Sequence, residues 1–118
     1  MTTPSLDESA KGVFIISATP FESNGALDFN STDRMVDYYL ESGVSGMTIL
    51  GVMGEAPKLT PGESMAFCQR VLKQVNDRVP VVVGVSSPSL GSIEAFSGKV
   101  MDAGASGVMV APMPNLRT

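Results

Sequence analysis

Four short, uninterrupted apolar runs are spaced along the chain, and glycine, proline or serine follows closely after each. They cover residues 13–18, 47–50, 81–85 and 108–111 and are rich in β-branched side chains. Continuous apolar runs of this length are typical of strands that are buried on both faces, as in parallel sheets. The pattern therefore predicts four strands of one parallel sheet.

The stretches between these runs repeat apolar residues at helical spacing, which predicts helices over residues 31–42, 61–78 and 92–103. The second helix has the clearest start, because Thr60 and Glu63 flank Pro61 as a capping-box pair. The stripes expected to face a core contain Met35, Val36, Tyr39 and Leu40 in the first helix, Phe67, Cys68, Val71, Leu72 and Val75 in the second, and Ile93, Phe96, Val100 and Met101 in the third.

One short joint appears twice, before the second and before the fourth strand. Residues 41–46 read ESGVSG and residues 102–107 read DAGASG, and in each the first glycine suits the position that ends a helix. A joint used twice implies stacked βα units with right-handed crossovers. The predicted order is β-α-β-α-β-α-β, a parallel α/β architecture.

This order fits both a doubly wound sheet and a closed barrel. An eight-stranded (β/α)8 TIM barrel needs roughly 250 residues, so a chain of 118 residues would be its N-terminal half. Residues 1–118 are then a single partial domain of four strands. The chain stops at Thr118, before the helix that should follow the fourth strand, which we interpret as an interruption.

The composition excludes several classes of partner and binding site. A net charge of −4 and a pI near 4.6 indicate no nucleic-acid partner. No apolar run reaches the roughly 20 residues needed to span a bilayer, and the polar start MTTPSLDESAKG lacks the features of a signal peptide, so we expect a cytoplasmic protein that does not bind membranes. With no histidine and the single Cys68, metal sites built on His and Cys are excluded, and no cofactor is expected.

Ligands of parallel α/β folds bind beyond the carboxyl ends of the strands. There, residues 51–55 read GVMGE. Glycines at 51 and 54 allow positive φ and close backbone approach, so the amides of Val52 and Met53 could together hold a small anion such as a carboxylate. The motif matches neither a P-loop nor a dinucleotide fingerprint. A simple tight turn explains the same residues.

The segment Gly51 to Glu55, followed by Leu59-Thr60, resembles the Gly-x-x-Gly-Glu…Leu-Thr/Ser signature of the dihydrodipicolinate synthase and N-acetylneuraminate lyase family. Thr19-Pro20-Phe21 resembles the family's Thr-Pro-Phe after the first strand. Segments 80–84 and 104–112 also fall in family register, so the resemblance covers essentially the whole chain. It implies the N-terminal half of a class I aldolase barrel.

In that family a lysine at the end of the sixth strand forms a Schiff base with pyruvate or a related 2-keto acid. Carried over, the resemblance implies that the amides of Val52 and Met53 bind the keto-acid carboxylate. The supporting residues would be Thr19, Pro20, Gly51, Gly54 and Glu55, with Glu55 tying the loop to backbone amides. Family members are commonly homo-oligomers, so another copy of the chain is an expected partner.

Two departures point away from lysine biosynthesis and sialic acid cleavage. Val52 and Met53 lack the hydroxyl that the family usually carries in this turn, and residues 112–115 read PMPN where the family often has a tyrosine pair. A divergent aldolase or dehydratase of 2-keto acids fits better. No catalytic residue is expected within the chain, because the Schiff-base lysine would lie beyond Thr118.

Several other side chains near the expected site have plain structural explanations. Solvated surface positions are expected for Lys11, Lys73 and Lys99, and for Lys58 as well, although it sits closest to the turn. The serines at 86, 87 and 89 either bind a polar ligand or cap the third helix. The alternatives to a lyase are a non-catalytic half barrel or a doubly wound module that binds a small carboxylate.

Overall fold

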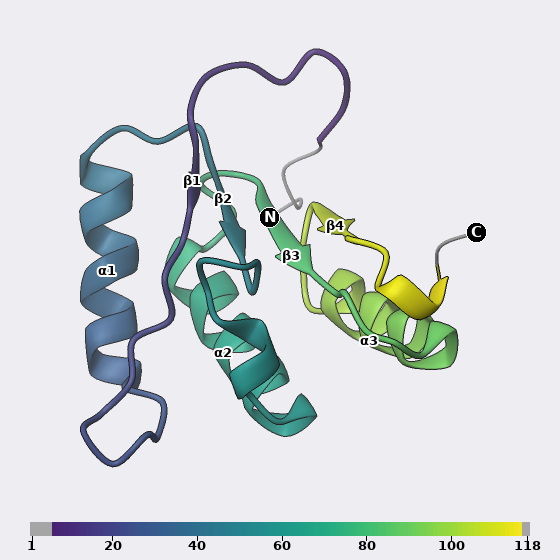
Figure 1. Ribbon diagram of the computed structural model, residues 1–118. Coiled ribbons are helices and arrows are strands. Elements are labelled where there is room, and N and C mark those ends of the chain that lie inside the picture. The colour runs from purple at the N-terminus through teal and green to yellow at the C-terminus, as the bar shows by residue number, and fades with distance from the viewer. Residues whose placement is uncertain (1–5, 117–118) are drawn as a thin grey trace.

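The computed structural model describes residues 6–116 and shows a parallel sheet flanked by helices (Figure 1). The strands are β1 (Phe14–Ile16), β2 (Gly46–Ile49), β3 (Val81–Gly84) and β4 (Gly107–Met109). The helices are α1 (Phe29–Glu41), α2 (Pro61–Val75) and α3 (Leu90–Asp102), with 3₁₀ turns η1 (Ala56–Lys58) and η2 (Pro114–Leu116). The predicted order is confirmed. Thr118, where we interpreted an interruption, lies outside the described residues.

The strand order decides between the two architectures. The sheet runs β1-β2-β3-β4, and every neighbouring pair is parallel. A doubly wound sheet reverses its strand order at a switch point, and there is no reversal among these four strands. Consecutive right-handed crossovers place all helices on one face, as in a barrel wall. The doubly wound alternative is therefore wrong.

The repeated joints form the same structure twice. Gly43 and Gly104 have φ of +85° and +114°, the left-handed region that glycine tolerates best. Two residues later, Ser45 donates its amide to the Val13 carbonyl, and Ser106 donates its amide to the Val81 carbonyl. The predicted glycine ends of α1 and α3 are confirmed, and each joint also starts the next strand pairing.

Helix α2 ends three residues earlier than its apolar spacing predicted. Asn76 and Asp77 adopt left-handed φ of 51° and 60°, a conformation that Asn and Asp accept better than most residues. The guanidinium of Arg78 then donates to the carbonyls of Gln74 and Val75 (2.6 and 2.9 Å), which satisfies two groups of the open helix end. At its start the Thr60–Glu63 capping box is confirmed.

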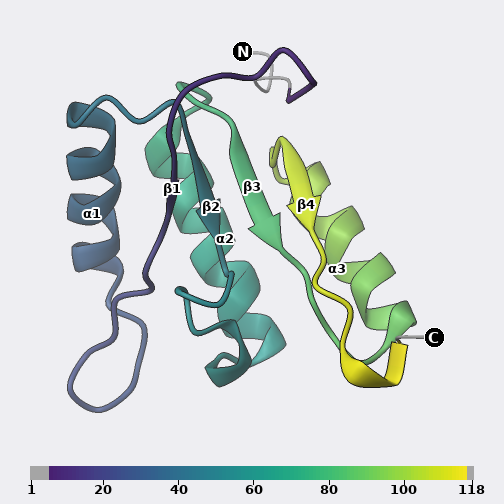
Figure 2. The same ribbon diagram turned by 45° about the horizontal axis from the view of Figure 1, so that its top comes forward.

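The core lies between the sheet and the helices. Figure 2 shows α2 and α3 behind the strands and α1 beside β1. Successive strand residues point to opposite faces, and those facing the helices are fully buried with the apolar stripe of α2. This buried set contains Val36, Met47, Ile49, Phe67, Cys68, Val71, Val75, Val81, Val83 and Val100. Met101, expected in the α3 stripe, is instead 44% exposed because no described element packs on that flank.

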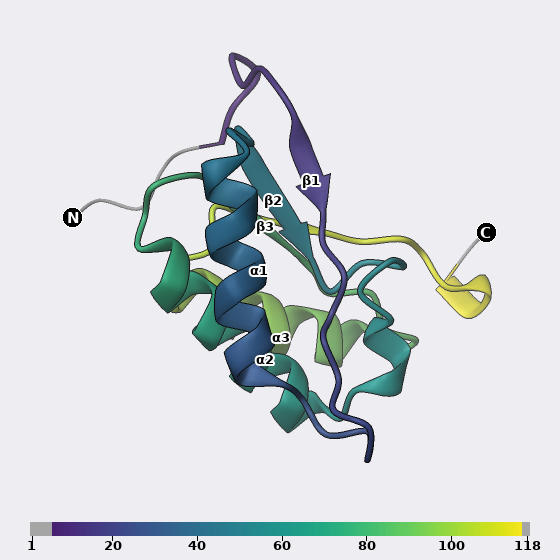
Figure 3. The same cartoon turned by 90° about the vertical axis from the view of Figure 1, so that its left-hand side faces the viewer.

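The opposite face of the sheet is open. Ile16, Thr48 and Val82 lie side by side in register on this face, and Ile16 is 57% exposed. The segment before β1 reaches only its β4 edge, where the Leu6 side chain lies 3.3 Å from the position of a Cβ on Gly107, the register partner of Val82. Figure 3 shows the same layering from the side. The edge strands β1 and β4 each pair with a single described neighbour. None of the described helices is long and apolar enough to cross a membrane.

Candidate functional site

The chain leaves β2 through a strained turn. Leu50 is 4% exposed and has a φ of +57°, which is unusual for a bulky residue without a local hydrogen-bonding side chain. Gly54 then donates its amide to the Gly51 carbonyl at 3.1 Å, and Glu55 donates to the Val52 carbonyl at 3.0 Å. Glu55 also has a left-handed φ, of +55°. Strained residues thus flank both sides of the turn.

The two amides inside this turn have no internal acceptor. Within residues 6–116, no carbonyl or side chain accepts a hydrogen bond from the N–H of Val52 or of Met53. The two residues are 90% and 63% exposed, so this part of the turn faces solvent. Successive N–H groups in a turn form anion-binding concavities. The geometry therefore suits the predicted carboxylate role of Val52 and Met53.

The two glycines serve the turn differently from our prediction. Neither Gly51 nor Gly54 has a positive φ; the left-handed residues are Leu50 and Glu55. The expected close approach is present at Gly54, where a Cβ would lie 3.1 Å from the Leu50 nitrogen and 3.3 Å from the Thr19 hydroxyl. At Gly51 a Cβ would meet nothing nearer than the Met109 methyl, at 3.7 Å. Space, and not φ, explains the glycine at 54.

Thr19 fixes the turn from the loop after β1. It is 5% exposed and donates its hydroxyl to the Gly54 carbonyl at 2.7 Å. Pro20 acts elsewhere: its carbonyl accepts the Asp28 amide at 3.1 Å, next to the antiparallel bridge between Phe21 and Leu27. Of these two predicted supporting residues, only Thr19 bonds to the turn directly in the structure.

Glu55 differs from its expected role. Its carboxylate pairs with the Lys58 ammonium, three residues along η1, and accepts from no backbone amide in the described part of the chain. Both side chains are substantially exposed, at 44% and 70%. The pair neutralises the only charges of the loop from Gly51 to Thr60. Glu55 therefore shapes the loop through its backbone and a surface ion pair.

Serines join the neighbouring loops into one rim. Ser89 caps α3 by accepting the Ser92 amide at 3.2 Å, which confirms the capping interpretation at that position. Ser87 accepts the Ser89 amide at 3.2 Å. Ser86 instead accepts the Ala111 amide at 2.8 Å and so ties the loop after β3 to the loop after β4. Sequence spacing offered no signal for this last contact.

A hollow of about 1180 Å³ opens beside the turn. Its lining comes from the loops after β2, β3 and β4 and from facing residues of α2 and α3. The larger side chains on it are mostly apolar, namely Leu50, Val52, Met65, Phe96, Met109 and Met113. Nothing in the sequence pattern indicates a role for Met109. Its register partner is Gly84, where the Leu50 carbonyl oxygen fills the space of a side chain, 2.2 Å from the position of a Cβ.

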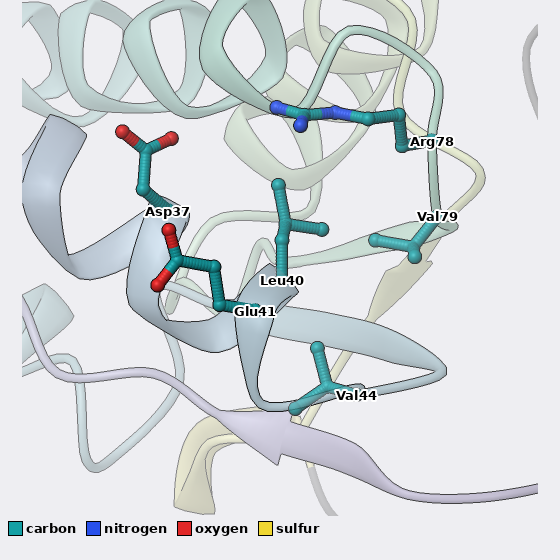
Figure 4. A pocket seen from close by; sticks show the side chains of 6 residues that line it. All are labelled: Asp37, Leu40, Glu41, Val44, Arg78 and Val79. Carbon is teal, nitrogen blue, oxygen red and sulfur yellow. The ribbon is translucent and has the colours of Figure 1, made fainter.

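A second hollow, of about 470 Å³, lies near the C-terminal end of α1 and is lined by Asp37, Leu40, Glu41, Val44, Arg78 and Val79 (Figure 4). Its polar groups are largely used within the fold. Arg78 closes the end of α2, and the Asp37 carboxylate accepts a hydrogen bond from the side-chain amide Nε2 of Gln74 at 2.8 Å. Polar residues away from the carboxyl ends of barrel strands contribute to stability more than to chemistry.

Titratable groups in the described residues are not arranged as an acid–base pair at the turn. The four lysines, Lys11, Lys58, Lys73 and Lys99, are exposed, as predicted. Burial raises the pKa of Cys68 to about 12, because the thiolate would be desolvated in the α2 core. This thiol therefore remains protonated and lies on the helix side of the sheet. What the site offers is a pair of backbone donors beside an apolar hollow.

The sequence that forms this site matches a known protein family. The model of the dihydrodipicolinate synthetase family matches residues 9–114. The chain belongs to this family. The earlier resemblance is thereby confirmed over nearly the full length.

Relatives in the dihydrodipicolinate synthetase family agree in sequence and fold. A 4-hydroxy-tetrahydrodipicolinate synthase from Pelobacter propionicus is 41% identical over 106 residues, which are 89% of this chain and 36% of that protein. The dihydrodipicolinate synthase structure from Rhodopseudomonas palustris shares 45% identity with a TM-score of 0.90, over 97% of this chain and 38% of its own. The described chain is therefore the N-terminal part of the family's TIM barrel, as predicted.

A third relative was solved with a ligand. YagE, a prophage protein of the family from E. coli K12, was crystallised in complex with pyruvate; it shares 30% identity with a TM-score of 0.81, over 84% of this chain and 33% of its own. The chain thus spans about a third of the length of the family members that it matches.

Proposed function

We propose that these residues form the carboxylate-binding wall of a Schiff-base lyase that acts on pyruvate or a related 2-keto acid. The proposal rests on the amides of Val52 and Met53, which lie at the carboxyl edge of the sheet and have no acceptor among residues 6–116. An edge of this kind is where barrel enzymes place their chemistry. Family membership and the pyruvate complex of YagE support the same assignment.

Binding of the carboxylate would orient the keto carbon for attack. In the proposed reaction a lysine amine adds to that carbon, water leaves, and a protonated imine forms. Loss of a proton from the adjacent carbon gives an enamine, which adds to an aldehyde; cleavage runs these steps in reverse. We expect the lysine to come from polypeptide outside residues 1–118, because the four lysines of the chain are exposed. The 118 residues alone should bind without turnover.

The chemistry of the turn argues for a divergent member of the family. The side chains of Val52 and Met53 carry no proton that a relay could use, and Pro112 to Asn115 supply no phenol. We therefore place the reaction among aldol or dehydratase steps of 2-keto acids, outside the synthase reaction after which the relatives are named. A carboxylate-binding module without catalysis is the alternative, and the exposure of every lysine favours it for the isolated chain.

Trapping with borohydride tests the proposal. The protein is isolated as its native source produces it, incubated with pyruvate, reduced, and weighed intact by mass spectrometry. A reduced adduct on a polypeptide heavier than 12.3 kDa supports the lyase. An unmodified protein, in a sample whose Val52 and Met53 amides still respond to pyruvate by NMR, supports the non-catalytic module. No response at those amides contradicts both functions.

A further inference from the structure

We infer that the preferred ligand is a monocarboxylic 2-keto acid with an apolar substituent, branched aliphatic or aromatic, and that Val52 and Met109 contact this substituent. The inference rests on the proposed function and deepens it, because it names the substrate class of the same site. It follows from what surrounds the amides of Val52 and Met53. These surroundings are the strained turn of residues 50–55, here called the anchor, the apolar wall formed by the side chains of Val52 and Met109, and few unpaired charges.

The anchor is built for a ligand and not merely for a chain reversal. Leu50 and Glu55 hold left-handed φ values without being glycine, and such strain gathers at ligand clamps, where the surrounding fold enforces it. Thr19 enforces it here from a different loop. A tight turn needing only to connect β2 to η1 has no use for this strain, since glycine at either position would remove it.

The part of the apolar wall that lies next to the anchor is the thioether side chain of Met109. The Met109 methyl lies 3.7 Å from the position that a Cβ of Gly51 would occupy, so the Met109 side chain adjoins the residue immediately before the two free amides. Met109 is 45% exposed and Val52 is 90% exposed. Both line the hollow of about 1180 Å³. A substituent that leaves the anchored keto acid toward this hollow meets apolar atoms first.

Several polar side chains of the hollow already bond to other groups of the fold, and Ser64, Ser92 and Lys99 are the others on its lining among the described residues. Ser86 and Ser87 already accept backbone amides, and Glu55 and Lys58 pair with each other. The remaining cation on the lining is Lys99. It lies nine residues into α3, about 13 Å along the helix from the carboxyl edge of the sheet. A short substituent therefore ends before Lys99, and a second carboxylate near the turn would approach Glu55.

The test compares three keto acids on the 118-residue chain: pyruvate, 4-methyl-2-oxopentanoate and 2-oxoglutarate. Each is titrated by NMR against protein labelled with ¹⁵N and with ¹³C in the methionine methyls. All are followed at the amides of Val52 and Met53, and at the methyl of Met109. Full burial of one CH₂ raises affinity about fourfold, and the added branch here would be only partly covered. We expect 4-methyl-2-oxopentanoate to bind about tenfold more tightly than pyruvate, with 2-oxoglutarate weakest.

A matched pair of variants locates the effect. Met109→Thr should reduce the preference for 4-methyl-2-oxopentanoate over pyruvate to about twofold, because the thioether wall is lost. Val108→Thr makes a similar change on the neighbouring β4 residue, which does not line the hollow, and should leave the preference intact. The spectra themselves report whether each variant is folded, and the wild-type series needs no variant at all.

The outcomes distinguish a failure of carboxylate binding at the turn from a failure of the preference for an apolar substituent. If none of the three acids moves the Val52 and Met53 amides, the proposed function fails and this inference fails with it. If pyruvate binds there while 4-methyl-2-oxopentanoate binds no more tightly, or 2-oxoglutarate binds best, the carboxylate site stands and the apolar substrate class is overturned. An equal loss of preference in both variants also overturns the role of Met109.

Discussion

The two faces of the sheet carry the same kind of side chain and differ in what covers them. On the helix side, Met47, Ile49, Val81 and Val83 are at most 2% exposed. On the other side, Ile16 lies in register with Thr48 and Val82 and remains 57% exposed. Parallel sheets are normally buried on both faces. Each strand therefore has a sequence suited to burial on both faces, and the helices of residues 6–116 cover one of these faces.

The largest effect that tests this difference is a matched pair of truncations. Ile49→Ala should lower the free energy of unfolding by about 3 kcal/mol, because it opens a cavity in a close-packed core. Ile16→Ala removes the same atoms from the open face and should cost below about 1 kcal/mol. Urea unfolding of the 118-residue chain measures both.

Equal losses in the two variants would show that Ile16 is buried in solution. The open face would then be covered by another molecule, and the comparison would hold only for the isolated chain. Repeating the measurement at several protein concentrations distinguishes the cases, because stability contributed by association rises with concentration.

The open face and the two edge strands should also make the chain associate. Exposed apolar surface and unpaired strand edges both promote contact between copies. We expect light scattering to give a mass above 12.3 kDa for the 118-residue chain. Ile16→Asp should shift it toward the monomer by placing a charge on the open face.

Tyr38→Asp is the control for this experiment. Tyr38 is 67% exposed and lies on α1, on the helix side of the molecule. It should leave the association unchanged. A wild-type chain that is a monodisperse monomer would contradict the prediction, and equal effects of the two charges would mean that solubility, and not the open face, controls association.

A smaller effect is expected from removing either of two buried hydroxyls, those of Thr19 and Thr32. Thr19→Val leaves the Gly54 carbonyl without its donor and should cost about 2 kcal/mol of stability. It should also weaken pyruvate binding, since the turn loses its brace. Thr32→Val removes a hydroxyl on α1 that donates to the carbonyl of Asp28, the N-cap residue, and that makes no bond to the turn. The Asp28 carbonyl keeps the backbone amide of Thr32 as a donor.

We therefore expect Thr32→Val to lose less stability than Thr19→Val, because its acceptor keeps a donor. Only Thr19→Val should lose binding, as followed by NMR at the Val52 and Met53 amides. If both variants bind pyruvate equally well, Thr19 stabilises the fold without positioning the turn. If both lose binding, general loosening of the structure explains the effect.

Much of this fold was predictable because its signals are local. The joints at Gly43 and Gly104 contain, within six residues, the glycine that ends the helix and the serine whose amide starts the next strand pairing. The Thr60–Glu63 capping box is local in the same way. The strand order could not be predicted from periodicity, because a barrel and a doubly wound sheet share the same element sequence, and pairing between strands decided it.

The site was less predictable because its geometry depends on contacts across the chain. The turn was located by its glycines, yet the left-handed residues are Leu50 and Glu55, which no propensity indicates. The enforcing hydroxyl comes from Thr19, 35 residues before Gly54. Met109 reaches Gly51 only because β4 lies two strands from β2 in the sheet.

The outer surface of the helix layer supplies the smallest expected effect, and it depends on pH. Arg70 donates two hydrogen bonds to Asp33, at 2.8 and 2.7 Å, and so joins α2 to α1. These bonds hold the pKa of Asp33 below its ordinary value of 3.8, against the opposing effect of desolvation. A lowered folded-state pKa stabilises the protein above the unfolded value, and this stabilisation disappears as the pH falls through the lowered folded pKa.

Arg70→Gln should therefore return the pKa of Asp33 toward its ordinary value and flatten the acid limb of stability, by less than about 1 kcal/mol for so exposed a pair. Arg34→Gln is the control, since the charge of Arg34 is the weakest of the causes acting on Asp33. NMR titration of the Asp33 carboxyl, in the Ile16→Asp background to limit association, measures the shift directly. An unchanged Asp33 titration in Arg70→Gln would mean that the salt bridge does not persist in solution, and that apolar burial and the Gln74–Asp37 hydrogen bond hold α2 against α1.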